Sequence, residues 1–316
     1  MEQSTQVRFV PVSPRAGDIK TTNGVLLVRE RAINLAVLPG VYMRRDPADA
    51  APVVFDVPRS GAEYPRWFAA SAPLDLIQKS ISSYVEALYR DVTDAGATWL
   101  YACFPNVVVD PNRHEADIDP DQLNGMWHEE LNPSEKTKAG MGLFPNVVSN
   151  QALHAGKLTL EDARRRLSEY YLPYHEELAR ILRMAKESAG VAYHLSCHSM
   201  GATPPATAKD AGVRRSDFDL GDRNGTTCEP GLVDSVAACL RRQGYTVTVN
   251  KHFVGAEAVR RHGDPRNSFH SLQIEMNRSL YMNEKTREVS ENFQQVKSDM
   301  TVLAREVVDY ARSRSR

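Results

Sequence analysis

The chain has 316 residues and a formal net charge of −1. This even balance excludes the general attraction to nucleic acid or acidic membranes that strongly basic proteins show, although a few local arginines could still hold a small anion. The length permits a large buried core, and no stretch approaches the roughly 18 apolar residues that span a bilayer. The first ten residues also lack the basic and apolar regions of a signal peptide, so we expect a soluble, cytoplasmic protein.

Residues 1–50 have the pattern of short strands and turns, and residues 46–52 form a polar joint rich in Ala, Asp and Pro. We therefore predict N-terminal strands and turns, residues 1–50, packed on a single main domain, residues 51–316. In that domain, apolar runs predict strands at residues 51–58, 98–103, 107–110, 191–197, 246–250 and 271–275. Helices are predicted at residues 81–92 (stopping at Gly96), 160–190 (with a break at Pro173), 232–243 and 286–313.

The alternation of strands and helices predicts the fold class. It indicates an α/β fold of three layers, with a mixed, mostly parallel sheet flanked by helices. Ligands of such sheets gather at the carboxyl ends of the strands. Asp110, Cys197 and Glu275 all end predicted strands, so we expect one composite site there. The polar segment 114–160 is too long for an idle connection, and we expect it to border that site.

Glu275 is the strongest single candidate residue, because it ends an apolar strand and acids are rarely buried there without a partner. Asn277, Arg278 and Tyr281 follow it within six residues. A carboxylate among amide, guanidinium and phenol groups suits a general base beside an anion clamp. The alternative is a salt bridge from Glu275 to Arg278 or to another arginine.

A second candidate lies at Asp110-Pro111-Asn112-Arg113. The proline makes a rigid turn that presents the Asn112 amide beside the Arg113 guanidinium. This pair could grip a substrate carboxylate with directional hydrogen bonds. The alternative is a strand-end turn in which Asp110 caps local backbone amides.

His198 lies in the segment Ser196-Cys197-His198-Ser199-Met200-Gly201, for which two active roles compete. His198 could be a metal ligand or an electrophilic or acid–base group, or the segment could be a nucleophile elbow with Ser199 as the nucleophile. Cys197 stands where the elbow needs a glycine, and two prolines among residues 202–212 block the helix that should follow. A structural His198, hydrogen-bonded in a core, is a third interpretation.

Three other polar features carry less specific signals. Residues 219–225 read as a polar turn that could line a pocket but is more typical of a surface loop. Residues 250–265 are expected to flank the site, without an assigned role. His175 lies within a helical pattern and is expected to be a packed or capping histidine.

Five segments together resemble the N-formylglutamate amidohydrolase family in order and spacing, over about residues 50–305. They are VVFDVPRSGAEYP (residues 53–65), VVVDPNR (107–113), YHLSCHSM (193–200), LGDRNGTTCEP (220–230) and LQIEMNRSLYMNE (272–284). The resemblance implies a layout similar to that of zinc carboxypeptidases and aspartoacylases. It also implies a hydrolase that cleaves the amide of an N-acylated acidic amino acid such as N-formylglutamate, with no nucleic-acid or membrane partner.

The resemblance also implies roles for individual residues. His198 would be a ligand of a divalent metal, with zinc as the first candidate, and Glu275 would be the general base and proton shuttle. Asn112 and Arg113 would form the carboxylate grip, and Arg278 would be a further substrate-binding residue. A bound metal would lower the pKa of its water and polarise the acyl oxygen.

The chain departs from the family pattern at two positions. Arg59 stands where relatives carry a metal-binding histidine, and Ser82 aligns with an expected aspartate ligand. A guanidinium that stays protonated cannot donate a lone pair to a metal. Three interpretations follow. Acids such as Asp56, Glu63 or Glu86 could substitute as ligands. Arg59 could itself be catalytic and supply the positive charge, either polarising the acyl oxygen or holding a second carboxylate. The protein could instead be a non-catalytic member that binds a small acidic ligand.

Overall fold

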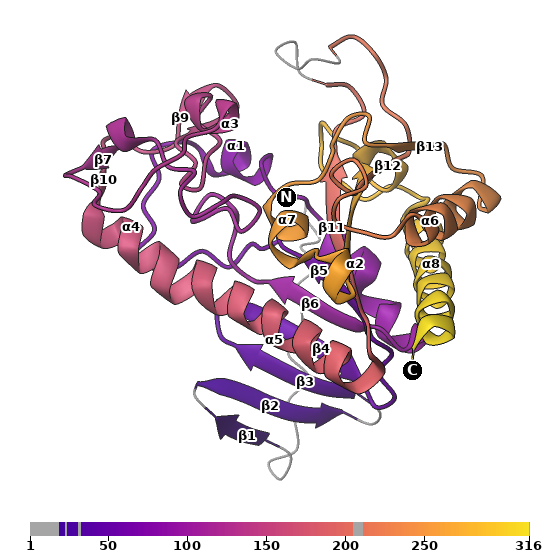
Figure 1. Ribbon diagram of the computed structural model, residues 1–316. Coiled ribbons are helices and arrows are strands. Elements are labelled where there is room, and N and C mark those ends of the chain that lie inside the picture. Colours follow the sequence, from indigo (N-terminus) through magenta and orange to yellow (C-terminus); the bar gives the residue numbers. More distant parts are fainter. Residues whose placement is uncertain (1–18, 23, 31–32, 205–210, 316) are drawn as a thin grey trace, which may run out of the picture.

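The computed structural model describes residues 19–22, 24–30, 33–204 and 211–315, and the first ten residues therefore lie outside it. One sheet of ten strands forms the centre of the described chain (Figure 1), in the order β1-β2-β3-β4-β6-β5-β11-β14-β12-β13. Its strands are β1 (Ile19–Thr22), β2 (Val25–Glu30), β3 (Ile33–Leu38), β4 (Tyr42–Pro47), β5 (Val53–Val57), β6 (Thr98–Ala102), β11 (Ala192–Met200), β12 (Phe218–Gly221), β13 (Val247–Val249) and β14 (Phe269–Asn277).

The middle of the sheet is parallel, and its margins bring in antiparallel pairs. Strands β6, β5, β11 and β14 run parallel to one another, whereas β14 pairs antiparallel with β12. The strands β1 to β4 form an antiparallel meander that joins the same sheet through β4 and β6. The mixed sheet of the predicted fold class is thus confirmed, while the division of the chain at residue 50 stays a prediction.

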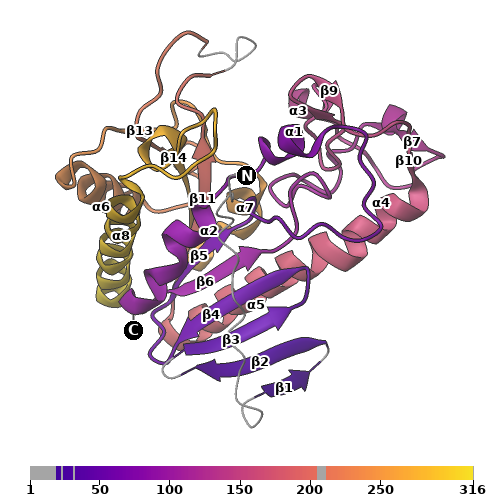
Figure 2. The same cartoon turned by 180° about the vertical axis from the view of Figure 1, so that it is seen from behind.

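Helices cover both faces of the sheet (Figures 1 and 2). One face carries α2 (Val85–Tyr89), η1 (Arg90–Ala95), α6 (Pro230–Arg242) and α8 (Phe293–Arg314), and the other carries α4 (Leu160–Arg166), η3 (Leu167–Tyr171), α5 (Leu172–Ala189) and α7 (Glu257–His262). No helix among the residues that the structure describes has both the length and the apolar character for crossing a membrane. The three predicted layers are therefore present.

The short elements lie mostly in the connections. They are α1 (Leu74–Gln78), η2 (Pro120–Gln122), β7 (Leu123–Asn124), α3 (Glu135–Lys138), β8 (Val147–Val148), β9 (Gln151–Ala152), β10 (Leu158–Thr159), η4 (Pro265–Asn267) and η5 (Arg278–Leu280). Much of the segment between β6 and α4 is irregular, as its polar sequence predicts.

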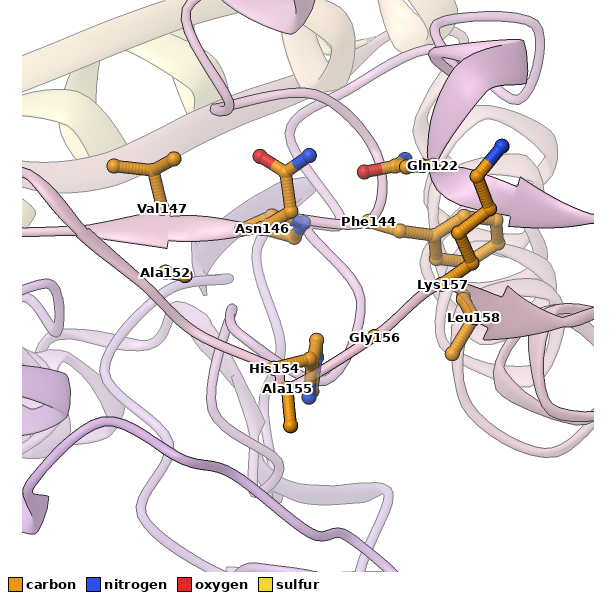
Figure 3. Close-up of a pocket in the computed structure, with 11 residues that line it drawn as sticks. Gln122, Phe144, Asn146, Val147, Ala152, His154, Ala155, Gly156, Lys157 and Leu158 are labelled. Carbon is orange, nitrogen blue, oxygen red and sulfur yellow. The ribbon is translucent and has the colours of Figure 1, made fainter.

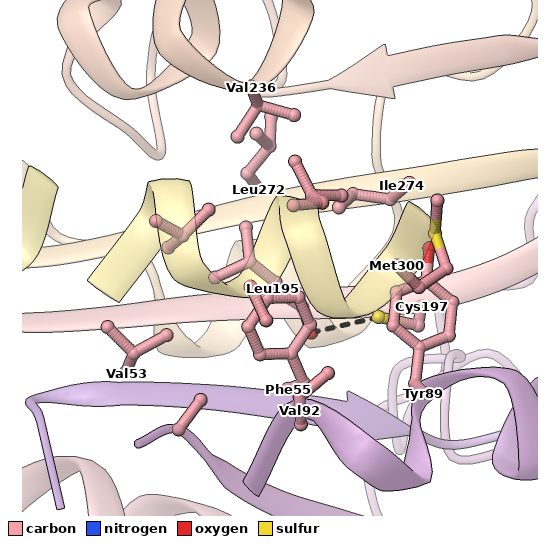
Figure 4. Packing of buried hydrophobic residues seen from close by; sticks show 14 of the residues in the cluster. Val53, Phe55, Tyr89, Val92, Leu195, Cys197, Val236, Leu272, Ile274 and Met300 are labelled. Atoms are coloured by element: carbon pink, nitrogen blue, oxygen red, sulfur yellow. Dashed lines mark hydrogen bonds between the residues drawn. The ribbon is translucent and has the colours of Figure 1, made fainter. Parts of the chain in front are cut away.

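The two faces of the central strands differ in chemistry, because side chains alternate across a strand. The face toward α2, α6 and α8 is apolar. There Val53, Phe55, Leu195, Leu272 and Ile274 pack against helix residues that include Tyr89, Val92, Val236 and Met300 (Figure 4). Each such side chain contributes roughly 1.5–3 kcal/mol through its burial.

The opposite face of the same strands is polar and buried. It carries Asp56 of β5, three residues of β11, three of β14 and one of β12: His194, Ser196, His198, Ser271, Gln273, Glu275 and Asp219. Buried polar groups are costly unless they are paired. Helices α5 and α7 pack over this face, so the sheet presents a covered polar surface that leads to the carboxyl ends of its parallel strands.

The structure corrects several of the predictions about strands. Residues 107–110 lie in a turn and the irregular segment after it, and not in a strand. Strands β4 and β5 already occupy both edges of β6. Strand β11 continues to Met200, so Cys197 and His198 lie inside it. Strand β14 likewise continues to Asn277, so Glu275 lies inside its strand instead of ending it. Residues 219–221 belong to the buried strand β12, so the surface-loop interpretation is wrong for that part of the 219–225 segment.

The predicted helices are present with shifted ends. The helix predicted at residues 81–92 is the short α2 followed by η1, and it stops at Gly96, which has a left-handed φ of 94° that suits glycine. The closing helix begins at Phe293 instead of residue 286, because Val289 pairs with Met282 ahead of it. The break predicted at Pro173 is a π-helical turn, Leu167–Tyr171, between α4 and α5.

Candidate functional site

A row of three buried side chains crosses strands β11, β14 and β12. Glu275 lies beside His198 in the parallel pair and beside Asp219 in the antiparallel pair. All three are at most 6% exposed. The structure thus brings together two predicted site residues, Glu275 and His198. It adds a second carboxylate, Asp219, from the segment that the sequence favoured as a surface loop.

The Glu275 carboxyl is tuned by opposing effects. Burial raises its pKa, the positive charges of Arg59 and Arg278 lower it, and the negative charge of Asp219 raises it, with a result of about 7. The Asp219 carboxylate is fixed nearby, because it accepts hydrogen bonds from the backbone N–H groups of His252 and Phe253, both at 2.7 Å. A carboxyl with a pKa near neutrality can both take up and release a proton in a reaction.

Gln273 fixes the orientation of Glu275. The Gln273 side-chain oxygen accepts a hydrogen bond from the Ala256 backbone N–H at 3.0 Å, so the amide nitrogen points the other way. That nitrogen donates to Glu275 Oε1 at 2.9 Å. The position of the candidate base is therefore set by a backbone group just before α7.

Asn112 fixes His198 in a similar manner. The Asn112 Oδ1 atom accepts from the Ala258 backbone N–H at 2.9 Å, so the Nδ2 atom must donate to His198 Nε2, 3.2 Å away. Burial, and after it the charge of Arg59, lowers the His198 pKa to about 3. His198 is therefore neutral near pH 7 and carries its proton on Nδ1.

Three arginines surround this row. Arg59 Nε lies 3.4 Å from Asp110 Oδ1, and Arg113 Nε lies 4.0 Å from Asp110 Oδ2. Arg278 donates from Nε to Ser199 Oγ at 3.0 Å, and its charge acts on Glu275. The expected cationic residues thus lie around one site, and Asp110 links two of them.

The Asp110 turn combines both interpretations of its sequence. Asp110 Oδ1 accepts from the Asn112 backbone N–H at 3.0 Å, as in a capping turn. Arg113 donates from Nε to the carbonyl oxygen of Met141, in the long loop after β6. The hydroxyl of Tyr171, in the π-helical turn, donates to the Arg113 carbonyl at 2.9 Å. The long loop therefore borders the site at Arg113, as predicted.

A model of the N-formylglutamate amidohydrolase family matches residues 51–282, well over half of the chain. The chain belongs to the N-formylglutamate amidohydrolase family. The N-formylglutamate deformylases of Pseudomonas aeruginosa and Pseudomonas putida are each 29% identical to it over 205 residues, which are 64% of this chain and 70% of each relative.

Solved structures extend this likeness over more of the chain. A crystal structure of N-formylglutamate amidohydrolase from Ralstonia eutropha has a TM-score of 0.83 and 39% identity, and covers 87% of this chain and 99% of that one. A gene product of Agrobacterium tumefaciens has a TM-score of 0.60 at 17% identity, and covers 86% of this chain and 95% of its own. The second likeness shows the fold alone.

Within this amidohydrolase fold, the candidate metal ligands do not gather around His198. Asp56 accepts from the Tyr174 hydroxyl at 2.9 Å and lies 2.7 Å from His194 Nε2. Glu86 lies on α2, across the sheet from His198, and bonds Ser60; burial raises its pKa to about 7. Glu63 is exposed beside Cys103. Each of the three acids therefore has a different neighbourhood.

The His198 ring and Ser82 complete this test of a metal centre. The His198 Nε2 lone pair faces the Asn112 amide and the Ser196 hydroxyl, 3.1 Å away. Ser82 is held by its backbone, which bonds Arg59 and Ser60. No group of three or more His, Cys, Asp or Glu residues in the described chain could hold a metal ion. These residues do not fit the three protein ligands of a catalytic zinc site.

The nucleophile-elbow interpretation of Ser199 does not agree with the geometry. Ser199 lies within the regular strand β11 and has none of the left-handed φ angles of the described chain, whereas an elbow is a sharp, strained turn. Adjacent residues of a strand point to opposite faces, so His198 and Ser199 face apart. His198 therefore cannot activate this hydroxyl.

Sequence reasoning missed Gln273, Asp219 and His194. The available signal was the period-two alternation of polar residues inside apolar strands, as in His194-x-Ser196-x-His198 and Gln273-x-Glu275. Such alternation predicts a strand with one polar face. His175 is packed as expected, with Nε2 placed 2.8 Å from the Pro111 carbonyl oxygen.

Two pockets open along the loop between β6 and α4. A pocket of about 370 Å³ is lined by Phe144, Asn146, His154 and Lys157 among others (Figure 3), and none of the candidate site residues lines it. A second pocket, of about 390 Å³, is lined by Trp127, Arg164 and also His114 and Glu115. The second pocket therefore adjoins the turn that carries Arg113.

Proposed function

We propose that the protein hydrolyses the amide bond of an N-formyl, or other N-acyl, acidic amino acid, with N-formylglutamate as the type substrate. Family membership and the two relatives named N-formylglutamate deformylase support this substrate class. The proposal also includes a cytoplasmic location.

Glu275 is the general base in this proposal. Its carboxylate takes a proton from the attacking water and returns it to the nitrogen of the leaving amine. The observation that carries the assignment is the position of this buried carboxyl, in register with His198 and held by Gln273. Burial raises its pKa to about 7. A carboxyl of this pKa is about half ionised at pH 7, so it can both accept and release a proton.

Arg113 and Arg278 hold the carboxylates of the acidic substrate. Both guanidiniums are oriented by single protein acceptors at Nε, Met141 for Arg113 and Ser199 for Arg278. Arginine prefers bidentate contacts with carboxylates, and such contacts convert binding energy into alignment of the scissile bond. Asn112 acts with them by orienting His198, since both atoms of its amide have protein partners.

A substrate panel tests this function. The assay measures formate or amine release from N-formyl-L-glutamate, N-formyl-L-aspartate, N-acetyl-L-glutamate and the neutral N-formyl-L-leucine. We expect turnover of the acidic compounds, and a KM about tenfold to a hundredfold higher in Arg113→Met, because a charge-assisted bond is lost. The matched control is Arg66→Met, since Arg66 is exposed on the loop after β5. Absence of turnover for every acidic compound would contradict the proposal.

A second candidate is a binding protein that keeps the anion site without the chemistry. The observation that favours it is the set of described residues, which does not fit a three-ligand metal centre. It predicts that glutamate raises the melting temperature by a few degrees at saturation, while no N-acyl compound in the panel is hydrolysed. The panel therefore separates the two candidates in one set of measurements.

A further inference from the structure

Arg59 differs from the other two site arginines in its hydrogen bonding. Arg113 and Arg278 each donate two hydrogen bonds to protein oxygens. Arg59, in contrast, has the Asp110 carboxylate at 3.4 Å as an ion-pair partner, and its buried Nε finds no hydrogen-bond partner in the described part of the chain. With 28% of its side chain exposed, its guanidinium retains donors for a ligand.

The backbone that carries Arg59 is held firmly. Arg59 follows β5 after Pro58, and its carbonyl oxygen accepts from the Ser82 backbone N–H at 2.9 Å. Two residues later, Gly61 packs so closely on the Phe104 carbonyl oxygen that any side chain there would collide with it. A cation on such a fixed segment loses little order when it binds a developing charge.

The charge of Arg59 also reaches both central residues of the site. Among the charged groups that shift the pKa of His198 and of Glu275, Arg59 acts most strongly on each. Strand β5 neighbours β11, and β11 neighbours β14, so all three residues lie near the same end of the parallel strands. The guanidinium therefore lies close enough for its charge to act on both the candidate base and the neutral histidine.

We infer that Arg59 donates hydrogen bonds to the acyl oxygen of the substrate and stabilises the oxyanion that forms there. This inference rests on the proposed function. Water adds to the acyl carbon while its proton passes to Glu275, and the carbonyl electron pair moves onto the oxygen beside Arg59. The oxyanion then collapses, the carbon–nitrogen bond breaks, and the Glu275 proton passes to the nitrogen. This step releases the carboxylic acid, formic acid for a formyl substrate, and the neutral amine. The acid then gives up its remaining proton, so that the final products are the carboxylate and the protonated amine.

This assignment explains why an arginine stands at position 59, where relatives carry a histidine. A histidine at position 59 could ligate a metal, whereas an arginine carries its positive charge permanently. The described residues do not form a three-ligand metal centre, yet the reaction needs positive charge at the acyl oxygen. Arg59 supplies that charge from the protein itself.

Steady-state kinetics on Arg59→Met and Arg59→Lys test the inference, with Arg66→Met as the control. Removing one oxyanion donor typically costs about a hundredfold or more in kcat. We expect this loss in Arg59→Met with little change in KM, and a smaller loss in Arg59→Lys, which keeps the charge. A raised KM with an unchanged kcat would overturn the inference, because Arg59 would then be holding a substrate carboxylate.

Formate binding provides a readout that does not depend on turnover. Formate is the product that contains the former acyl oxygen, so it should bind where Arg59 contacts that oxygen. It should therefore raise the melting temperature of the glutamate-bound wild type. Sodium chloride is the ionic-strength control. The Arg59→Met protein should bind glutamate normally and lose the response to formate. Equal formate responses in the two proteins would overturn the role of Arg59, whereas a wild type that releases no formate from any N-formyl acid would overturn the proposed function instead.

Discussion

Two histidines of β11, four residues apart on the same polar face, each have a carboxylate on a neighbouring strand, but the two carboxylates behave differently. Asp56 contacts His194 directly at 2.7 Å and also accepts from Tyr174. Burial acts to raise its pKa, but His194, His198 and Ser196 together outweigh burial, so the pKa is lowered. The other ring nitrogen of His194, Nδ1, lies 2.6 Å from Ser271 Oγ.

Glu275 is also buried, but its partners stabilise the ionised carboxylate less than the partners of Asp56 do. Gln273 donates one hydrogen bond, and the charges of Arg59 and Arg278 oppose burial only in part, so the pKa rises to about 7. The comparison teaches that burial alone does not make a carboxyl catalytic. Direct pairing with a histidine holds Asp56 as a carboxylate, whereas burial among balanced charges gives Glu275 a raised pKa that suits the base we propose.

The largest expected effect is a loss of activity when Glu275, and not Asp56, loses its proton acceptor. Glu275→Gln keeps the shape of the side chain but removes the proton acceptor, and general-base catalysis typically contributes about 10²- to 10⁴-fold. We expect a loss of kcat in that range, measured as formate release from N-formyl-L-glutamate. Glu291→Gln, at an exposed position just before α8, should leave kcat unchanged. Full turnover in Glu275→Gln would refute its role as the base.

The next largest effect is a loss of folding stability when the Asp56 carboxylate is removed. Asp56→Asn breaks a fully buried pair, which typically costs about 3–5 kcal/mol in the free energy of unfolding. The surface pair of Asp49 with Arg312 provides the control, because Asp49→Asn should cost less than about 1 kcal/mol. Urea denaturation measures both. If Asp56→Asn folds as stably as the wild type while turnover disappears, the structural assignment of Asp56 is wrong.

A smaller effect is expected where orientation, and not chemistry, is removed. Asn112→Ala frees the His198 ring from its donor and leaves the Ala258 N–H without its acceptor. A displaced catalytic group of this kind can cost up to about a hundredfold in rate. We expect the loss in kcat, with glutamate affinity retained by calorimetry, and no change in Asn132→Ala, which replaces an exposed asparagine. A loss of glutamate affinity with a normal kcat would instead show that Asn112 binds the substrate carboxylate.

The sequence predicted the layers of the fold because its apolar runs and helical periodicities are local signals. It also predicted that Glu275, His198 and Arg113 would share a site, since ligands of such sheets gather where parallel strands end. The prediction of a strand at residues 107–110 was wrong. Both edges of the neighbouring strand β6 are occupied by β4 and β5, and this pairing between distant segments has no local signal.

The rest of the site depends on contacts that no local pattern encodes. The Asn112 amide finds its acceptor and donor partners at Ala258 and His198, 146 and 86 residues away. Asp219 became a neighbour of Glu275 only through the antiparallel pairing of β12 with β14. Physical properties such as the pKa of Glu275 follow from these long-range neighbours, so they could not be predicted from its own segment.

The pH dependence of kcat/KM for N-formyl-L-glutamate hydrolysis tests the central claim most directly. A general base works in its ionised form, so a carboxyl with a pKa of about 7 should make kcat/KM rise with pH through that value and then level off. We predict a one-proton rising limb with its midpoint near pH 7. Full activity already at pH 5, with no rise toward pH 8, would contradict the assignment of Glu275 as the base.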